Sequence, residues 1–124
     1  MAKYVKTIVK KSSVIPWING DVVSAESTYL TDAEKQMMID ARTEIESFPG
    51  FLNFNVINVG NTQIISFEFD TIENMNNFVN KTQKADSGIY DSTTAMVKYN
   101  KMVVKKIKEV GLSDAYQVST STET

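Results

Sequence analysis

The chain has 124 residues, of which 42% are hydrophobic and 23% are charged, a composition typical of a single globular domain. It contains no cysteine and no histidine, and its formal net charge is -2. These counts exclude disulfides, thiolate nucleophiles, and any metal, haem or acid–base site that depends on imidazole or thiolate groups.

The amino-terminal residues 1–11 carry four lysines and lack the long apolar run of a secretory signal. No stretch of the chain approaches the roughly 20 consecutive apolar residues that a membrane helix needs. We therefore expect a cytoplasmic protein that has no membrane partner.

The first predicted elements are a strand and a long connection. Residues 3–10 are rich in β-branched side chains and predict a strand. Residues 11–30 contain Pro16, Asn19-Gly20 and the single tryptophan, Trp17, which indicates a loop. Connections of this length in a compact domain often serve as a lid or a partner-binding arm.

The next predicted element is a helix over residues 32–48. Thr31 and Glu34 have the spacing of a capping box, which marks its start, and Pro49-Gly50 ends it. Apolar side chains recur at steps of three and four residues and form one stripe. This stripe comprises Ala33, Met37, Met38, Ala41, Ile45 and Phe48.

Residues 51–59 and 63–69 alternate between apolar and polar side chains, and Gly60-Asn61 between them favours a tight turn. This pattern predicts a β-hairpin whose strands each have one apolar face. The apolar positions are Leu52, Phe54 and Val56 on the first strand, and Ile65, Phe67 and Phe69 on the second.

Two further helices are predicted after the hairpin. Asp70 and Glu73 have capping-box spacing and open a helix that Gly88 breaks. Residues 91–110 form the next helix, and Gly111 is a natural residue to follow its carboxyl end. The apolar sides are Ile72, Met75, Phe78 and Val79 on the first of these helices, and Ala95, Met96, Tyr99, Met102, Val103, Ile107 and Val110 on the other.

Residues 114–119 predict a short last strand, and the Ser/Thr-rich tail 120–124 is expected to fray. The resulting order is β-α-β-β-α-α-β, in which the last two helices count as one split helix. This is the ferredoxin-like βαββαβ arrangement. We therefore predict an α+β fold with a four-stranded antiparallel sheet, helices on one face, and a single domain over residues 1–119.

The other face of this sheet would be too apolar for water if Tyr4, Ile8, Ile57, Val59 and Ile64 pointed that way. A second copy of the same sheet would cover such a face. We therefore expect a homodimer whose two sheets pair into a dimeric α+β barrel.

Several segments together resemble a known group of proteins. They are helix 32–48, the run Phe48-Pro49-Gly50-Phe51-Leu52, the hairpin end Ser66-Phe67-Glu68-Phe69-Asp70, and the following helix with Phe78. Over residues 31–119 the chain resembles the antibiotic-biosynthesis-monooxygenase-like proteins of the dimeric ferredoxin-like, or dimeric α+β barrel, superfamily. The resemblance implies the same dimeric fold.

The members of this group include cofactor-free oxygenases, haem-degrading enzymes, haem peroxidase relatives and lactone isomerases. Many of the enzymes use a histidine, or an Asn-Trp-His set, between helix and sheet. This chain has no histidine, and Trp17 lies in the first connection rather than on the second helix, where the haem degraders have their tryptophan. The resemblance therefore transfers no catalytic residue, and we expect no cofactor.

The charged residues are distributed unevenly along the chain. Residues 21–73 hold ten acids and two bases, whereas residues 81–108 hold seven lysines and two acids. One interpretation is a pair of solvated helix faces of opposite sign. The other is an electrostatic contact, in which the acidic face of one subunit meets the basic helix of another or the lysines bind a polyanion.

Carboxylates and amides give little sign of a reactive centre. Asp40 and Glu44 lie one helical turn apart on the predicted helix exterior, so we expect a solvated face and no metal site. Glu68 is expected to pair with a lysine rather than to act as an acid or base. Arg42 is expected to pair with Glu46, or else to anchor a ligand carboxylate.

The element order is also that of RNA-recognition modules, so nucleic acid is a candidate ligand. Residues 64–69 are similar to the end of the third-strand motif of those modules. The preceding segment Asn61-Thr62-Gln63-Ile64 lacks the basic-Gly-aromatic-Gly pattern, and the lysines concentrate on a helix rather than on the sheet. We therefore expect no nucleic-acid partner.

The methionines and aromatic residues suggest a ligand cavity between sheet and helices, although an ordinary packed core would also use them. A carboxylated aliphatic molecule such as a fatty acid would suit apolar walls and a polar entrance formed by Arg42, lysine or tyrosine side chains. The candidate ligand-binding residues are Trp17, Met37, Met38, Arg42, Phe54, Phe67, Phe69, Phe78, Tyr90, Met96 and Tyr99.

The expected function is therefore a dimeric protein that binds an apolar, fatty-acid-like molecule without catalysis. The first alternative is a cofactor-free monooxygenase or isomerase that relies on substrate reactivity and a tyrosine or asparagine environment. The second alternative is a structural or assembly protein with a filled core.

Overall fold

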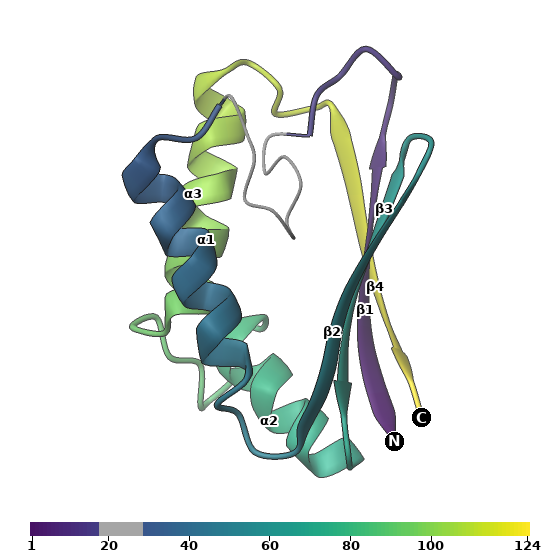
Figure 1. Ribbon diagram of the computed structural model, residues 1–124, viewed down its shortest axis with the longest axis vertical. Coiled ribbons are helices and arrows are strands. Elements are labelled where there is room, and N and C mark those ends of the chain that lie inside the picture. Colours follow the sequence, from purple (N-terminus) through teal and green to yellow (C-terminus); the bar gives the residue numbers. More distant parts are fainter. Residues whose placement is uncertain (18–28) are drawn as a thin grey trace.

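A computed structural model describes residues 1–17 and 29–124 (Figure 1). The Asn19-Gly20 turn and most of the predicted connection 11–30 therefore lie outside the described residues. The elements follow the predicted order. They are β1 (Ala2–Lys10), α1 (Asp32–Ile45), β2 (Phe51–Val59), β3 (Thr62–Phe69), α2 (Ile72–Thr82), α3 (Ala95–Glu109) and β4 (Tyr116–Glu123).

The described strands form one four-stranded sheet with the order β2-β3-β1-β4, and all neighbouring strands are antiparallel. In Figure 1 the helices stand on one side of this sheet, and α1 runs beside α3. The two ends of the chain lie next to each other because β1 and β4 are antiparallel neighbours. The prediction of a ferredoxin-like α+β fold is confirmed. No helix within the described ranges is long and apolar enough to cross a membrane.

The last strand is longer than predicted. It pairs with β1 up to the partners Lys3 and Glu123, so the expectation that residues 120–124 fray is wrong for all but the final residue. The side-chain pattern predicts too short a strand, because the Ser and Thr residues at its end bury little surface. Backbone hydrogen bonds to the edge of β1 hold the strand without apolar side chains.

The helix boundaries follow capping chemistry. At α1 the predicted capping box is present: the Thr31 hydroxyl accepts from the Glu34 N–H at 3.2 Å, and the Glu34 carboxylate accepts from the Thr31 N–H at 2.9 Å. Helix α1 nevertheless ends at Ile45 rather than 48. Ala33 in its first turn is exposed, so this residue does not belong to the buried apolar stripe.

Helix α2 begins one residue later than predicted. Thr71 is its N-cap, because its hydroxyl accepts from the Asn74 N–H at 3.1 Å. Asp70 instead accepts from the Asn74 side-chain amide at 2.8 Å. The helix also ends at Thr82, well before Gly88.

The faces of the β2 strand are shifted by a bulge between Phe51 and Asn53. Phe51 pairs with Phe69 on the helix-facing side, and Leu52 becomes the extra residue, 49% exposed. The prediction that Leu52 shares the apolar face of Phe54 is therefore wrong. Strict alternation cannot reveal a bulge, because one inserted residue exchanges the two faces.

The two faces of β1 also differ from the prediction. Tyr4 is buried in the core beneath the helices, and Ile8 packs against that core, so neither side chain faces the open side of the sheet. The register places other apolar side chains on the open face instead. They are Val5, Val9, Ile57, Val59 and Ile64.

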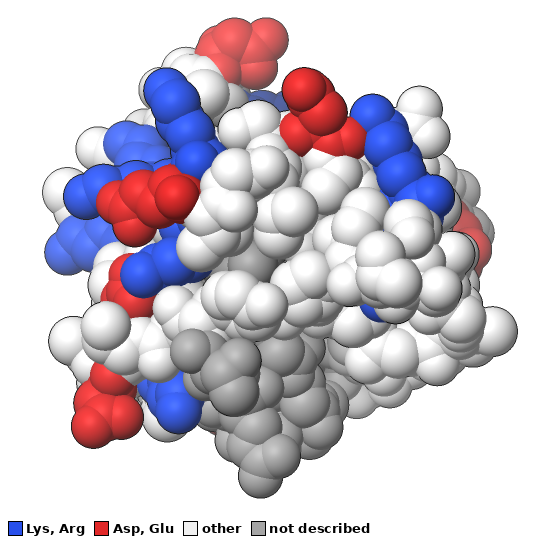
Figure 2. Space-filling view, turned by 90° about the horizontal axis from the view of Figure 1, so that it is seen from above, with Lys and Arg blue, Asp and Glu red and all other residues white. Residues whose placement is uncertain are grey.

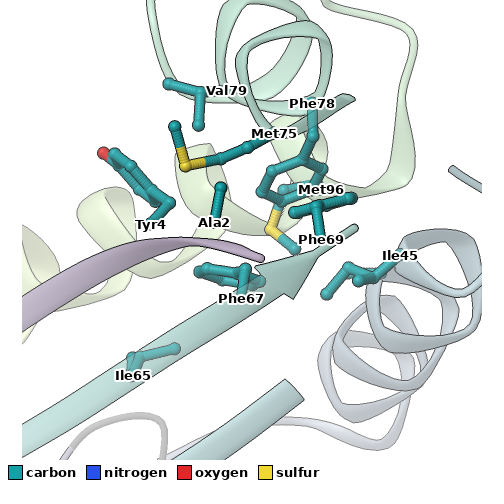
Figure 3. Packing of buried hydrophobic residues seen from close by; sticks show 11 residues of the cluster. Ala2, Tyr4, Ile45, Ile65, Phe67, Phe69, Met75, Phe78, Val79 and Met96 are labelled. Carbon is teal, nitrogen blue, oxygen red and sulfur yellow. The ribbon is translucent and has the colours of Figure 1, made fainter. Parts of the chain in front are cut away.

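The main core lies between the sheet and the carboxyl-terminal half of α1, with α2 covering its lower end. Figure 3 shows Phe67 and Phe69 of β3 facing Phe78 of α2. The ring centroids of Phe78 and Phe67 are 5.0 Å apart, and those of Phe78 and Phe69 are 5.2 Å apart. These aromatic contacts fix α2 against the sheet.

Glu44 joins α1 to α3. Its carboxylate accepts hydrogen bonds from the backbone N–H groups of Ala95 at 2.6 Å and Met96 at 3.1 Å. These are otherwise unpaired donors of the first turn of α3, where the helix dipole also favours a negative charge. The expectation that Glu44 belongs to a solvated face is therefore wrong.

Replacing Glu44 by alanine is expected to lower the free energy of unfolding by about 1–3 kcal/mol, because two charge-assisted hydrogen bonds are lost. Urea denaturation of the full chain measures this change. The matched control is Glu46→Ala at the exposed C-cap that follows the same helix, for which we expect a change within about 0.5 kcal/mol. Equal effects of the two substitutions would contradict the capping role of Glu44.

Acidic and basic side chains alternate on the helical side of the molecule when it is seen from above (Figure 2). Lys106 of α3 lies 3.0 Å from the Glu34 carboxylate of α1. The lysine-rich helix and the acidic helix of one chain therefore form an ion pair with each other at this point. The hydrogen bond from the Thr31 N–H, with Lys106 in support, holds the pKa of Glu34 below its usual range.

This lowered pKa predicts a pH-dependent contribution to stability. The folded chain binds fewer protons at Glu34 than the unfolded chain does, so stabilisation is complete above the ordinary glutamate pKa of about 4.3 and is lost as the pH falls. We expect Glu34→Gln to be less stable than the wild type at pH 7. The difference should shrink below pH 4 in urea denaturation across a pH series, and a difference independent of pH would contradict this prediction.

Candidate functional site

Two adjoining cavities lie between the sheet and the helices, the larger against α3 and the smaller against both α1 and α3. The larger has a volume of about 360 Å³ and the smaller about 50 Å³. Lys6, Ile65, Tyr99 and Asn100 line both, so the two cavities are neighbours. A volume of this size is within the usual range for small-molecule sites in proteins, roughly 300–1,000 Å³.

The walls of the larger cavity are mainly apolar. The sheet contributes Ile8 of β1 and Val118 of β4, and α3 contributes Val103 and Ile107. Polar groups enter at a few points, among them the Gln83 amide and the Tyr90 phenol. Apolar walls with few polar groups are typical of sites that bind a hydrocarbon chain and orient one polar end.

Lys6 is the charged residue that lines both cavities. Tyr4, Lys6 and Ile8 alternate along β1 and all face the helices. The Lys6 ammonium donates a hydrogen bond to the Gln83 side-chain carbonyl at 3.1 Å. None of the ion pairs between described residues includes Lys6, and burial lowers its pKa.

The sequence interpretation missed Lys6. The signal was present, because alternation along residues 3–10 assigns Lys6 to the same face as Tyr4 and Ile8. A lysine between two apolar residues on one strand face is either at a sheet edge or in a cavity. Only the sheet order decides between these, since it places β1 at the centre.

Trp17 is one of the residues that line the larger cavity. Its ring stacks on Tyr116 of β4 with centroids 6.0 Å apart, and the Lys10 ammonium lies 4.9 Å from its centroid. The Tyr116 hydroxyl donates to the Pro16 carbonyl. These contacts tie the start of the connection to the sheet beside the cavity.

The predicted site residues separate into three groups. Trp17, Tyr90 and Tyr99 line the larger cavity. The smaller cavity is lined by Met38, Arg42, Phe54, Phe67, Met96 and Tyr99. The remaining three pack elsewhere: Phe69 and Phe78 lie in the main core, and Met37 packs against a second cluster around Leu30 and Met102.

Arg42 lies over an aromatic ring at the smaller cavity, with its guanidinium carbon 5.7 Å from the Phe54 centroid. This geometry is a cation–π contact. Glu68 is paired as predicted, with its carboxylate 3.5 Å from the Lys3 ammonium on the open face of the sheet. Among residues 1–17 and 29–124, no three acidic side chains converge as a metal site would require.

No protein-family model and no curated protein matches the sequence. Among solved structures, the chain is similar to a candidate antibiotic biosynthesis monooxygenase from Deinococcus radiodurans, with 11% sequence identity and a TM-score of 0.43. The similarity covers 100% of this chain and 92% of that protein. A likeness this distant assigns no activity to this chain, and the fold rests on the strand order given above.

Proposed function

We propose that the protein binds an apolar, carboxylated small molecule in the cavities between the sheet and α3. The observation that carries this proposal is a mainly apolar cavity of about 360 Å³ with a lysine among its lining residues. The hydrocarbon chain would lie against the apolar walls, and the carboxylate would meet the Lys6 ammonium.

The electrostatics support a carboxylate at this position. An ammonium among apolar walls has lost part of its hydration, and within the described residues it donates a hydrogen bond to the neutral Gln83 amide. A bound carboxylate would add a charge-assisted hydrogen bond where the local dielectric constant is low. Such a partner would restore the charged form of Lys6 that burial disfavours. Lys6 therefore replaces Arg42 as the principal anchor in this proposal.

Calorimetric titration with decanoate tests the proposal. We expect Lys6→Met to weaken binding by roughly tenfold to a hundredfold, since a hydrogen bond to a charged group contributes about 1.5–3 kcal/mol. The matched control is Lys98→Met, which removes the same charge from the exposed side of α3. No binding of decanoate to the wild type, or equal losses in the two variants, would contradict the proposal.

We further propose that a second copy of the chain covers the open face of the sheet. Val5, Val9, Ile57, Val59 and Ile64 make this face apolar, which is costly to leave in water. Light scattering after size exclusion tests the subunit number. We expect a dimer that Ile57→Lys converts to a monomer, whereas Ile72→Lys on the exposed side of α2 leaves the dimer intact.

A cofactor-free oxygenase or isomerase is the second candidate function. It draws support from Tyr90, Tyr99 and Asn100, which give the cavity the phenol and amide groups that such chemistry would need. Oxygen uptake with polyphenol substrates tests this candidate. Uptake that is lost in Asn100→Leu would favour it over simple binding.

A further inference from the structure

We infer that Lys6 is a carbonyl-reactive amine that captures an apolar aldehyde or ketone in the larger cavity as an imine. The inference rests on the cavity of the proposed function but does not require a carboxylate ligand. It assigns a covalent step to a residue that the binding proposal uses only as a charge.

The surroundings of Lys6 differ from those of other lysines in the described part of the chain. Lys3 and Lys106 lie 3.5 and 3.0 Å from glutamate carboxylates, so each has an anionic partner. Lys10 lies over the Trp17 ring in a cation–π contact. The hydrogen-bond acceptor of Lys6 is the neutral amide of Gln83. An amide accepts a hydrogen bond from either the charged or the neutral amine, so it opposes loss of the proton less than a carboxylate would.

Burial also favours the neutral form of the Lys6 amine. Ile8 and Ile65 line the cavity next to Lys6, and desolvation by such walls lowers the pKa of its amine. Only the neutral amine carries the free electron pair that attacks carbon. A lysine desolvated in an apolar pocket is the usual way in which proteins produce an amine that forms Schiff bases.

The step is balanced and needs no oxidant or reductant. The electron pair of Lys6 Nζ forms a bond to the carbonyl carbon, and the carbonyl π pair moves to oxygen, which takes up a proton. The resulting carbinolamine loses its oxygen as water when the nitrogen pair forms the C=N bond. Overall, the ammonium and the carbonyl compound give a protonated imine and one water molecule. The Tyr90 phenol lines the same cavity and can donate a proton to the departing oxygen.

Octanal is a suitable probe, because it joins an apolar chain to an aldehyde. The full-length chain is incubated with a limiting amount of octanal and cyanoborohydride, which reduces the imine to a stable secondary amine. Intact-mass spectrometry counts the added octyl groups, and peptide mapping finds them. We expect one octyl group on Lys6, formed at least about tenfold faster than on Lys98, because the cavity holds the aldehyde beside the amine.

The variants separate reactivity from charge. Lys6→Arg keeps the positive charge but forms no imine under these conditions, so we expect it to lose the selective adduct, as Lys6→Met does. Lys98→Met should retain it. Labelling spread evenly over the lysines of the wild type, or absent from Lys6, would overturn the inference without reference to any variant.

Decanoate titration distinguishes this failure from a failure of the proposed function. Decanoate binding without an adduct on Lys6 overturns the imine and leaves the binding proposal standing. A selective adduct without decanoate binding supports the imine and overturns the proposal that the cavity binds a carboxylate. Decanoate that slows octanal labelling of Lys6 supports one shared cavity for both ligands.

Discussion

Replacing Phe78 by alanine is expected to lower the free energy of unfolding by about 3–5 kcal/mol. Phe78 is fully buried and meets three other rings at centroid distances of 5.0 Å for Phe67, 5.1 Å for Phe48 and 5.2 Å for Phe69. The substitution removes the side chain that joins α2 to the sheet and to the connection between α1 and β2. It leaves a cavity that fixed neighbours on three sides cannot fill.

Urea denaturation of the full chain measures this loss, and Ile72→Ala on the same helix is the matched control. Ile72 is 52% exposed, so its truncation should cost no more than about 1 kcal/mol. A loss below 1 kcal/mol for Phe78→Ala would mean that α2 does not pack against the sheet as described.

Replacing Gly50 by alanine is expected to lower the free energy of unfolding by about 2–3 kcal/mol. Gly50 has a φ of +77°, which an alanine adopts only with strain. The new methyl group would also meet the Asp70 carboxylate and the Asn74 amide, the latter at 2.5 Å. It would therefore displace the 2.8 Å hydrogen bond between those two side chains at the start of α2.

Gly60 provides the control for the backbone contribution alone. It has a φ of +58° in the β2–β3 turn, but a methyl group there would meet no neighbouring atom within 4 Å. We expect Gly60→Ala to cost only about 1–2 kcal/mol, the price of the left-handed conformation. If the two alanine variants unfold at the same urea concentration, the close contact between Gly50 and Asp70 carries no free energy.

Local chemistry explains which parts of the fold could be predicted from the sequence. The Thr31 capping box and the Gly60-Asn61 turn depend on neighbouring residues only, and both are present as predicted. The bulge at Leu52 and the length of β4 depend on a partner strand, whose register the sequence does not reveal. The same holds for the orientation of Tyr4, because either face of an apolar strand could have met the helices.

The sequence indicates the region between sheet and helices as the candidate site, but it does not single out Lys6 as a lining residue. Met38 and Tyr99 lie on predicted apolar helix faces and do line the cavities. Phe69 and Phe78 lie on equally apolar faces but belong to the filled core, because α2 closes the lower end of the molecule. Apolar patterning cannot separate a packed region from a hollow one. Lys6 was missed because charge at a strand position is usually a sign of exposure to solvent.

Native mass spectrometry of gently purified protein shows whether the region between the sheet and α3 is a binding site. A single spectrum gives the subunit number and the mass of any retained small molecule. We predict a dimer that carries an additional small molecule, or that takes up decanoate when it is added, with uptake reduced in Lys6→Met. If the protein takes up no decanoate and retains no small molecule, the region between the sheet and α3 is not a binding site for such ligands.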